Sequence, residues 1–319
     1  MTGPRILYCA PFLHSWGTEE HVARDAEAIG CEVIRAGERN FVDAMMRATD
    51  VDLVLYTRGV ESEHRRVTDW WVERYADDGF KTASLSLDLY RGLARESEVG
   101  RNPFWTTGRV FTPDDAPEWF TERGVKHSHL WPACVSDEVI EVDTNEYPIQ
   151  DYPAEIVFLG STRAYHPEHP WRLEMIAGLR KRYGERFAAF GPQEGNIVRG
   201  LEMNALFQSN NRIVVGDSLN LPGNRSYTSD RIFESLGRGA ALVYPFIPGL
   251  DALGFHDRDT LRYYDVGDLP YLFDVIDELL DNPDEARAMA QRGRALVASA
   301  HTYRHRVREI LDVLEIPHD

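Results

Sequence analysis

Arg231 and Glu234 lie three residues apart in the segment SYTSDRIFESLGRGAALVYP (residues 226–245). A guanidinium can bind a phosphate through two parallel hydrogen bonds, and a carboxylate can accept hydrogen bonds from two adjacent sugar hydroxyls, such as a ribose diol. On a helix the two side chains would share one face, because residues three apart are neighbours there. The pair therefore indicates a nucleotide site. The alternative is a surface helix on which Arg231 and Glu234 form an ion pair with each other.

The residues around this pair predict where the helix begins and ends. Thr228 or Ser229 can cap a helix that starts near Asp230, because either hydroxyl can accept an amide N–H of the first turn. Gly237 or Gly239 provides the usual C-terminal signal. The amino end of such a helix has unpaired amides and the positive end of the helix dipole, which favours a bound anion.

Two other residues are candidates for a general base that takes a proton from a hydroxyl. His14 follows the first apolar segment, and an imidazole can accept a proton near neutral pH. Asp88 follows the segment ASLSL (83–87) and is the second candidate. For each of them the alternative is a hydrogen-bonded loop residue without a chemical role.

The sequence predicts no metal site. Two Asp-x-Asp strings occur, at residues 50–52 and 257–259, but such strings are expected by chance in so acidic a chain. The first one precedes its strand, which is the wrong end for a metal at a ligand site. His301 and His305 have the spacing of a helical metal pair, but no third ligand is evident near them.

The surrounding elements form two similar series. Apolar strand-like segments alternate with amphipathic ones, beginning with RILYCA (5–10) and TEEHVARDAEAIG (18–30). The alternation lapses at 141–155, in polar sequence with two prolines, and restarts with EIVFLGS (155–161). Strands with few polar residues, alternating with helices, are typical of a parallel doubly wound sheet. The sequence therefore predicts two Rossmann-like domains joined by a linker at 141–155.

In such sheets ligands bind at the loops that follow the carboxyl ends of the strands. The loops that this rule selects are residues 11–19, 87–91, 160–169, 191–196, 217–229 and 245–250.

The charge balance limits the partners. With 35 basic and 52 acidic residues the formal net charge is -17, which opposes binding to nucleic acid or anionic lipid unless a local basic patch overrides it. The segment 91–109, with several arginines and the neighbouring aromatics Phe104 and Trp105, is the one candidate for such a patch. Its alternative interpretation is a loop that closes on any acceptor.

Cysteine usage and hydropathy predict the compartment. The three cysteines (Cys9, Cys31 and Cys134) are scattered and contain no C-x-x-C motif, which favours a reducing cytosol. The N-terminal segment is too interrupted for a signal peptide, and no window reaches the ~18 apolar residues of a membrane span. We therefore expect a cytoplasmic protein without a membrane span.

Five stretches resemble a known family in their order along the chain: EIVFLGSTR, RFAAFGPQ, ALFQSNNRIVVGDS, SDRIFESLGRGAALVYPFIPGLDAL and ARAMAQRGRALVASAHTYRHRVREIL. They resemble glycosyltransferases of the GT-B fold, in particular the CgeB-like branch of the glycosyl-transferase group 1 family. The resemblance implies an α/β protein with two Rossmann-like domains facing across a cleft. It implies an acceptor domain at 1–150, a nucleotide-sugar donor domain at 151–300, and a helix at 301–319 that returns to the N-terminal domain.

The resemblance also assigns roles to individual residues. It implies that Glu234 binds the donor ribose and that Arg231 and Ser229 contact the diphosphate. The other donor-binding residues that it implies are Gly17, Gly160, Ser161, Arg163, Gly191, Pro192, Tyr227 and Thr228. Many group 1 enzymes have a second glutamate eight residues before the ribose one; here that position is Ser226. This departure leaves the sugar preference and the stereochemical outcome open.

The expected function is a hexosyltransferase-like glycosyltransferase that moves a sugar from a nucleoside diphosphate sugar to a hydroxyl. Catalysis would need His14 or Asp88 as base and Arg231 to stabilise the leaving diphosphate, with no metal and no cofactor besides the donor. The acceptor stays open among a small molecule, a protein, a glycan and modified DNA. The alternatives are an enzyme that glycosylates a hydroxylated base in DNA, and a non-catalytic two-domain module that binds a nucleotide or sugar.

Overall fold

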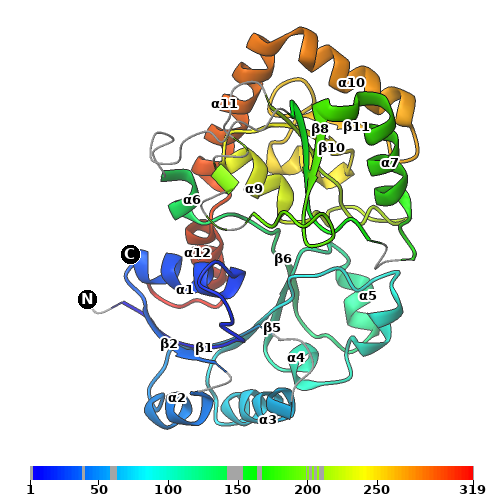
Figure 1. The fold of residues 1–319 in the computed structure, drawn as a ribbon. Helices are drawn as coiled ribbons and strands as arrows, with labels where there is room; N and C mark the ends of the chain where they lie inside the picture. Colours follow the sequence, from blue (N-terminus) through cyan, green and yellow to red (C-terminus); the bar gives the residue numbers. More distant parts are fainter. Residues whose placement is uncertain are drawn as a thin grey trace. The chain divides into compact units, whose positions relative to one another are not determined.

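The computed structural model describes residues 3–37, 40–57, 63–141, 154–163, 167–198, 200, 203–204, 207 and 212–318. The chain divides into two compact units: unit 1 comprises Met1–Pro132 and Tyr303–Asp319, and unit 2 comprises Ala133–Thr302 (Figure 1).

The division comes earlier in the chain than the predicted boundary near residue 150. Residues from Ala133 onward group with unit 2 because Val135 and Val139 are fully buried in its core, and Val135 forms a β-bridge with Thr302. Most of the predicted linker at 141–155 lies outside the described residues.

Within the described residues, unit 1 is built around a six-stranded sheet in the order β2-β1-β3-β4-β5-β6, with parallel pairing throughout. Its strands are β1 (Arg5–Cys9), β2 (Glu32–Ala36), β3 (Leu53–Thr57), β4 (Thr82–Leu85), β5 (Arg109–Thr112) and β6 (Ser128–Leu130). Its helices are α1 (Thr18–Ala28), α2 (Phe41–Arg47), α3 (Glu63–Asp77), the 3-10 helix η1 (Ala94–Glu98), α4 (Pro103–Thr106), α5 (Pro117–Glu122) and α12 (Tyr303–Val313).

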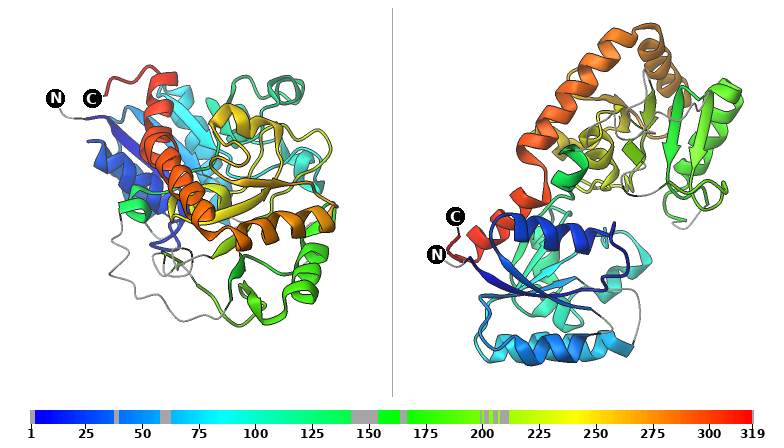
Figure 2. Two further views of the ribbon diagram at one scale, coloured as in Figure 1. Left: turned by 90° about the horizontal axis from the view of Figure 1, so that it is seen from above. Right: turned by 60° about the vertical axis from the view of Figure 1, so that its left-hand side comes forward.

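The helices of unit 1 cover both faces of this sheet. α1 and α12 lie side by side on one face, and α2 and α3 lie on the other (Figure 2). The central strand β3 is buried along its whole length, as expected for a parallel strand covered on both sides.

The last helix is tied into unit 1 by hydrogen bonds at both of its ends. The indole Nε1 of Trp131 donates to the Arg306 carbonyl oxygen at 3.3 Å, and Lys81 Nζ donates to the Leu314 carbonyl oxygen at 2.6 Å. Between these contacts the apolar side chains of Ile310 and Leu311 are buried. Hydrogen bonds at the two ends and burial of the apolar side chains between them therefore both hold the C-terminal segment in place.

We expect Leu311→Ala to destabilise unit 1 by about 2–5 kcal/mol, because it removes a fully buried side chain and leaves a cavity. Urea unfolding measures this loss. Asp312→Ala on the same helix is the control, since its carboxylate is exposed and makes only a 3.7 Å ion pair with His318. Equal stability of the two variants would show that α12 does not contribute to the unit's core.

Unit 2 contains a five-stranded parallel sheet, in the order β11-β10-β9-β7-β8 within the described residues. Its strands are β7 (Ile156–Leu159), β8 (Phe187–Phe190), β9 (Ile213–Val215), β10 (Ala241–Pro245) and β11 (Arg262–Tyr264). Its helices are α6 (Asp137–Glu141), α7 (Trp171–Tyr183), η2 (Gly184–Arg186), α9 (Arg231–Gly237), η3 (Pro248–Leu253), α10 (Leu269–Asp281) and α11 (Pro283–Ala300).

Alternate residues of β7 pack into two different cores of unit 2. Ile156 and Phe158 join the cluster formed with α7 and α10, and Val157 and Leu159 join the cluster formed with α9. Both faces of the sheet are therefore covered, and only the ends of the strands can present polar side chains to a ligand.

Among the helices described, none combines the length and the apolar character needed to cross a bilayer.

Candidate functional site

The direction in which the chain adds strands to the sheet of unit 2 reverses at β7. From β7 the chain adds β8 on one side and then returns to add β9 on the other side. In open α/β sheets the carboxyl ends of the strands at such a reversal are where ligands bind. The loops that leave these two ends begin at Gly160, after β7, and at Gly216, after β9.

Arg231, the first residue of α9, lies against the loop that follows β7. A Cβ atom placed on Gly160 would be 3.0 Å from both Nη1 and Nη2 of Arg231, and the guanidinium carbon is 5.4 Å from the ring centre of Phe158. Gly160 also has φ +149, a conformation that other residues rarely adopt. The backbone conformation therefore favours glycine here, and an added Cβ would crowd the guanidinium.

The guanidinium of Arg231 is a buried cation with an unsatisfied donor. Its Nη1 is buried and has no hydrogen-bond partner in the described part of the chain. Burial lowers the pKa of Arg231, the Arg172 guanidinium lowers it further, and Asp230 opposes the shift. An arginine stays charged even so. An anion bound beside Gly160 would provide the missing hydrogen-bond partner and the compensating charge.

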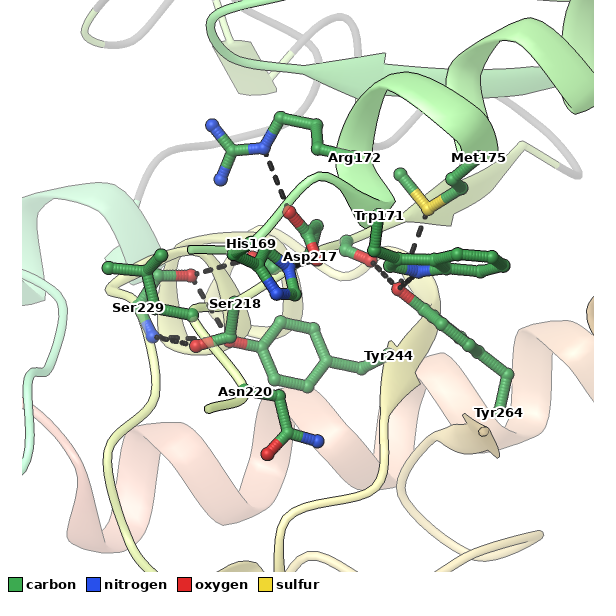
Figure 3. Close-up of polar contacts among 12 residues, drawn as sticks. His169, Trp171, Arg172, Met175, Asp217, Ser218, Asn220, Ser229, Tyr244 and Tyr264 are labelled. Atoms are coloured by element: carbon green, nitrogen blue, oxygen red, sulfur yellow. Dashed lines mark hydrogen bonds and ion pairs between the residues drawn. The ribbon is translucent and has the colours of Figure 1, made fainter. Parts of the chain in front are cut away.

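A fully buried carboxylate follows β9. Asp217 accepts from Arg172 Nε at 2.8 Å through Oδ2, and its Oδ1 is 3.1 Å from His169 Nε2 (Figure 3). Burial alone would raise the pKa of Asp217, but the bond to His169 and the charge of Arg172 outweigh it and the pKa is lowered. The carboxylate is therefore ionised and fixes one side chain just before α7 and one in its first turn.

The hydroxyl of Tyr244, at the end of β10, positions the segment before α9. It lies 2.9 Å from Thr228 Oγ1 and 3.1 Å from Ser229 Oγ, and it accepts from the Ser229 amide at 3.2 Å (Figure 3). Burial raises the pKa of this phenol, so it stays protonated. Ser229 Oγ in turn donates to the main-chain oxygen of Asp217 at 3.1 Å. The loops after β9 and before α9 are thereby joined beside Arg231.

Glu234 pairs with Arg238, the residue that follows the end of its helix, and not with Arg231. Its Oε2 accepts from Arg238 Nε at 3.1 Å and from Arg238 Nη2 at 2.6 Å. The other oxygen, Oε1, has no hydrogen bond within the described residues. The simple Arg231–Glu234 ion pair is thus excluded, because Glu234 is paired one turn further along. Its second oxygen is left to accept from a ligand.

The loops after β7 and β8 are packed closely together. A Cβ atom on Gly191 would lie 2.1 Å from the Gly160 carbonyl oxygen, so this position also requires glycine. Gln193 Oε1 accepts from Ser161 Oγ at 3.1 Å and from the Thr162 amide at 3.0 Å. Pro192 and Arg163 are exposed at the edge of this pair of loops.

The predicted capping by Thr228 or Ser229 is wrong. The N-cap residue is Asp230, with no side-chain cap, and the helix has only seven residues. The reason is that both hydroxyls are used elsewhere: Thr228 Oγ1 bonds within the loop and to Tyr244, and Ser229 Oγ bonds to Asp217. The positive charge at this end of α9 comes from the Arg231 side chain, and so short a helix adds little to it.

Three predicted residues belong to unit 1 and are described within it. His14 is exposed in the loop after β1, where its ring stacks on Trp16 at 4.4 Å between ring centres. Asp88 is exposed after β4 and pairs with Arg95 at 3.3 Å. Gly17 is the N-cap residue of α1. The remaining predicted residues, from Gly160 to Glu234, belong to unit 2.

Most arginines of the basic segment 91–109 already have partners. Arg91 makes two bonds to the buried Asp114, at 3.0 and 2.7 Å, and Arg95 pairs with Asp88. Arg109 Nη1 lies 3.1 Å from His129 Nε2. These contacts reduce the capacity of the segment to bind phosphates.

In the part of the chain that the structure describes, no three His, Cys, Asp or Glu side chains cluster closely enough to hold a metal ion. The two Asp-x-Asp strings are used in ion pairs: Asp50 bonds to Arg5, and Asp257 bonds to Arg262 at 3.2 Å.

The group centred on Asp217 consists of His169, Arg172 and Asp217. The loops selected from the sequence include His169 and Asp217, but the sequence did not indicate that the three side chains meet. The available signal was the Asp217 that directly follows the apolar run of β9, because a carboxylate at a buried strand end needs a partner.

Comparison with known proteins agrees with this architecture. Residues 172–312 match the family model described as "Glycosyl transferase-like". The comparison with curated proteins gives no match.

Solved structures similar to the chain share its fold at low sequence identity. Sucrose-phosphate synthase from Thermosynechococcus elongatus is 13% identical, with TM-score 0.62 and 98% of each chain covered. Anabaena HepE in complex with UDP and glucose is 12% identical, with TM-score 0.63 and coverage of 98% of this chain and 99% of that one. An alpha-glucosyltransferase in complex with UDP and a 13-mer DNA is 13% identical, with TM-score 0.56 and coverage of 99% and 100%.

The predicted GT-B fold is therefore confirmed by structures that align over nearly the whole chain. The predicted class of enzyme, a glycosyltransferase, is confirmed by the family-model match in the C-terminal half.

Proposed function

We propose that the protein transfers a sugar from a nucleoside diphosphate sugar to a hydroxyl acceptor, with unit 2 as the donor-binding unit. The observation that carries this proposal is the buried guanidinium of Arg231, which lies against Gly160 with Nη1 unsatisfied in the described part of the chain. It is placed where a sheet of this kind binds its ligand. A diphosphate is an anion of suitable charge and size for this position.

The residues of unit 2 would recognise two parts of the donor, its diphosphate and its ribose. Arg231 would bind the diphosphate and stabilise the negative charge that develops on it as the bond to the sugar breaks. Arg172, held by Asp217, adds a second cation to the same group. Glu234 would accept from the ribose diol through Oε1, since Arg238 holds Oε2. Phosphate and ribose together make a nucleotide the natural ligand.

Activation of the acceptor hydroxyl is assigned to unit 1. His14 and Asp88 follow different strands of its sheet, and both side chains are exposed. Either could accept the hydroxyl proton, and the proposal keeps both. The stereochemical outcome and the identity of the sugar are not part of it, because Ser226 stands where many related enzymes have a second glutamate.

The proposal includes three finer points. The chain would be a member of the CgeB-like branch, the enzyme would act in the cytoplasm, and it would need no metal. Cys9, Cys31 and Cys134 are buried and form no disulfide in the described part of the chain, which is compatible with a reducing compartment. Action on DNA is the weaker variant, although one similar structure was solved with DNA, because most arginines of the basic segment are paired and the net charge is -17.

The direct test is calorimetric titration with UDP, GDP, ADP and dTDP, followed by a donor-hydrolysis assay with the matching nucleotide sugars. We expect one nucleotide to bind and its sugar to be released or transferred. EDTA should leave the rate nearly unchanged, because guanidinium groups are expected to stabilise the leaving diphosphate. A rate abolished by EDTA and restored by Mn²⁺ would refute metal independence. Binding without any turnover would favour the non-catalytic module.

A further inference from the structure

His169 is a buried histidine that has no role among the proposed donor contacts. It lies between β7 and α7, and its side chain is 5% exposed. Its Nε2 is 3.1 Å from Oδ1 of Asp217, a carboxylate with no exposed surface (Figure 3). Its other ring nitrogen, Nδ1, has no hydrogen-bond partner among the residues that the structure describes. A carboxylate that holds one nitrogen fixes the ring and stabilises the imidazolium form, as in catalytic His–Asp pairs.

Asp217 connects the ring of His169 to the arginines of the proposed diphosphate site, Arg172 and Arg231. Asp217 holds His169 with one oxygen and Arg172 with the other, so a single carboxylate orients both side chains. The main-chain oxygen of Asp217 accepts from Ser229, two residues before Arg231. His169 therefore belongs to the same end of β9 at which the diphosphate is proposed to bind.

We infer that His169 is a catalytic residue of the donor site, whose Nδ1–H donates a proton to the leaving nucleoside diphosphate. This inference rests on the proposed function. As the bond between the sugar carbon and the β-phosphate oxygen breaks, its electron pair stays on that oxygen, and the oxygen takes the proton from the imidazolium. The acceptor oxygen forms the new bond to the sugar and loses its own proton to a general base. His169 is left neutral and regains a proton from solvent after the product leaves.

The charged and titratable groups around His169 determine when it is protonated. Asp217 contacts the ring directly and Arg172 shares that carboxylate, while Arg231 and Tyr264 interact with Asp217. Asp230 and Tyr244 interact with Arg231, and the exposed Glu168 is next to His169 in the chain. A bound diphosphate adds negative charge, so binding should be coupled to the uptake of a proton by His169.

Proton uptake can be measured without any turnover. The nucleoside diphosphate that binds in the titration series is titrated again near pH 7 in buffers of different ionisation enthalpy. His169→Gln keeps an amide that can donate to Asp217 but removes the titrating ring. We expect the wild type to take up a fraction of a proton and the variant to take up clearly less. His256→Gln is the control, since His256 makes an exposed 3.6 Å pair with Asp251 elsewhere in the unit.

Turnover provides the second readout. General acid catalysis contributes roughly 10²–10⁴-fold, so we expect His169→Gln to lower kcat by about 10²-fold with little change in KM. The wild-type kcat should fall as the pH rises and the imidazolium is lost, and the variant should lose this dependence. A histidine with only a structural role predicts lower stability and a raised KM with an unchanged pH profile.

The outcomes distinguish a failure of the proposed function from a failure of the role inferred for His169. If none of the four nucleotides binds, the proposed function is overturned, and this inference with it. If one binds but His169→Gln leaves both the proton uptake and the pH profile of kcat unchanged, only the role of His169 is overturned. Should His169→Gln fail to fold, Asp217→Asn is the second variant. It keeps the shape of the side chain and is expected to reduce the proton uptake, because it removes the charge that favours the imidazolium.

Discussion

Replacing Arg231 by lysine is expected to lower turnover by about 10²–10³-fold, the range found when one donor to a developing oxyanion is removed. Lysine keeps the positive charge but lacks the planar fork that fits between Gly160 and the ring of Phe158. Since negative charge on the diphosphate grows as the sugar bond breaks, the loss should be larger in kcat than in nucleotide affinity. Steady-state kinetics and calorimetry on the same preparation measure the two quantities.

Two other variants make this test specific. Gly160→Ala should have a similar effect, because its Cβ would lie 3.0 Å from the Arg231 guanidinium and displace it. Arg258→Lys should be without effect, since Arg258 is exposed and pairs with Glu278 away from this strand end. If turnover is unchanged in Arg231→Lys while the protein is folded, Arg231 does not stabilise the leaving group.

The fold could be predicted because each strand is recognisable from the few residues that form it. Apolar runs such as residues 53–57 and 156–159 are each buried on both faces, and this pattern occurs in parallel sheets between helices. The interruption of this alternation at 141–155 then indicates two separate sheets. The division at Pro132 could not be predicted, because it depends on Val135 and Val139 packing against a core formed by distant residues.

The candidate site was predictable only in part. Arg231 and Glu234 could be selected because their spacing on one helix is visible in the sequence. The partner of Glu234 could not be selected in this way, because Arg238 in the same segment gives an i,i+4 pair that competes equally with the i,i+3 pair to Arg231. The bonds from Asp217 to His169 and Arg172 join segments more than forty residues apart, and only the packing of β7 beside β9 brings them together.

The structure changes how the role of Glu234 should be tested. Glu234→Ala would remove a charged acceptor, with an expected loss of about 1.5–3 kcal/mol in nucleotide binding, or roughly ten- to a hundredfold in affinity. It would also leave Arg238 buried, with 2% of its side chain exposed, and without its carboxylate partner. Breaking such a pair costs about 3–5 kcal/mol of stability, so a loss of binding could reflect a disturbed helix.

Glu234→Gln avoids this difficulty, because its amide oxygen can still accept from Arg238. We expect the wild type to prefer a ribonucleotide over its 2′-deoxy form by about tenfold, the value of one good hydrogen bond to a charged group. In the variant this preference should shrink to nearly none. Because the two changes remove the same interaction, their effects on affinity should not add. Glu285→Gln, an exposed carboxylate paired with Arg292, should keep the full preference. An undiminished preference for ribose in folded Glu234→Gln would show that this carboxylate does not bind the diol.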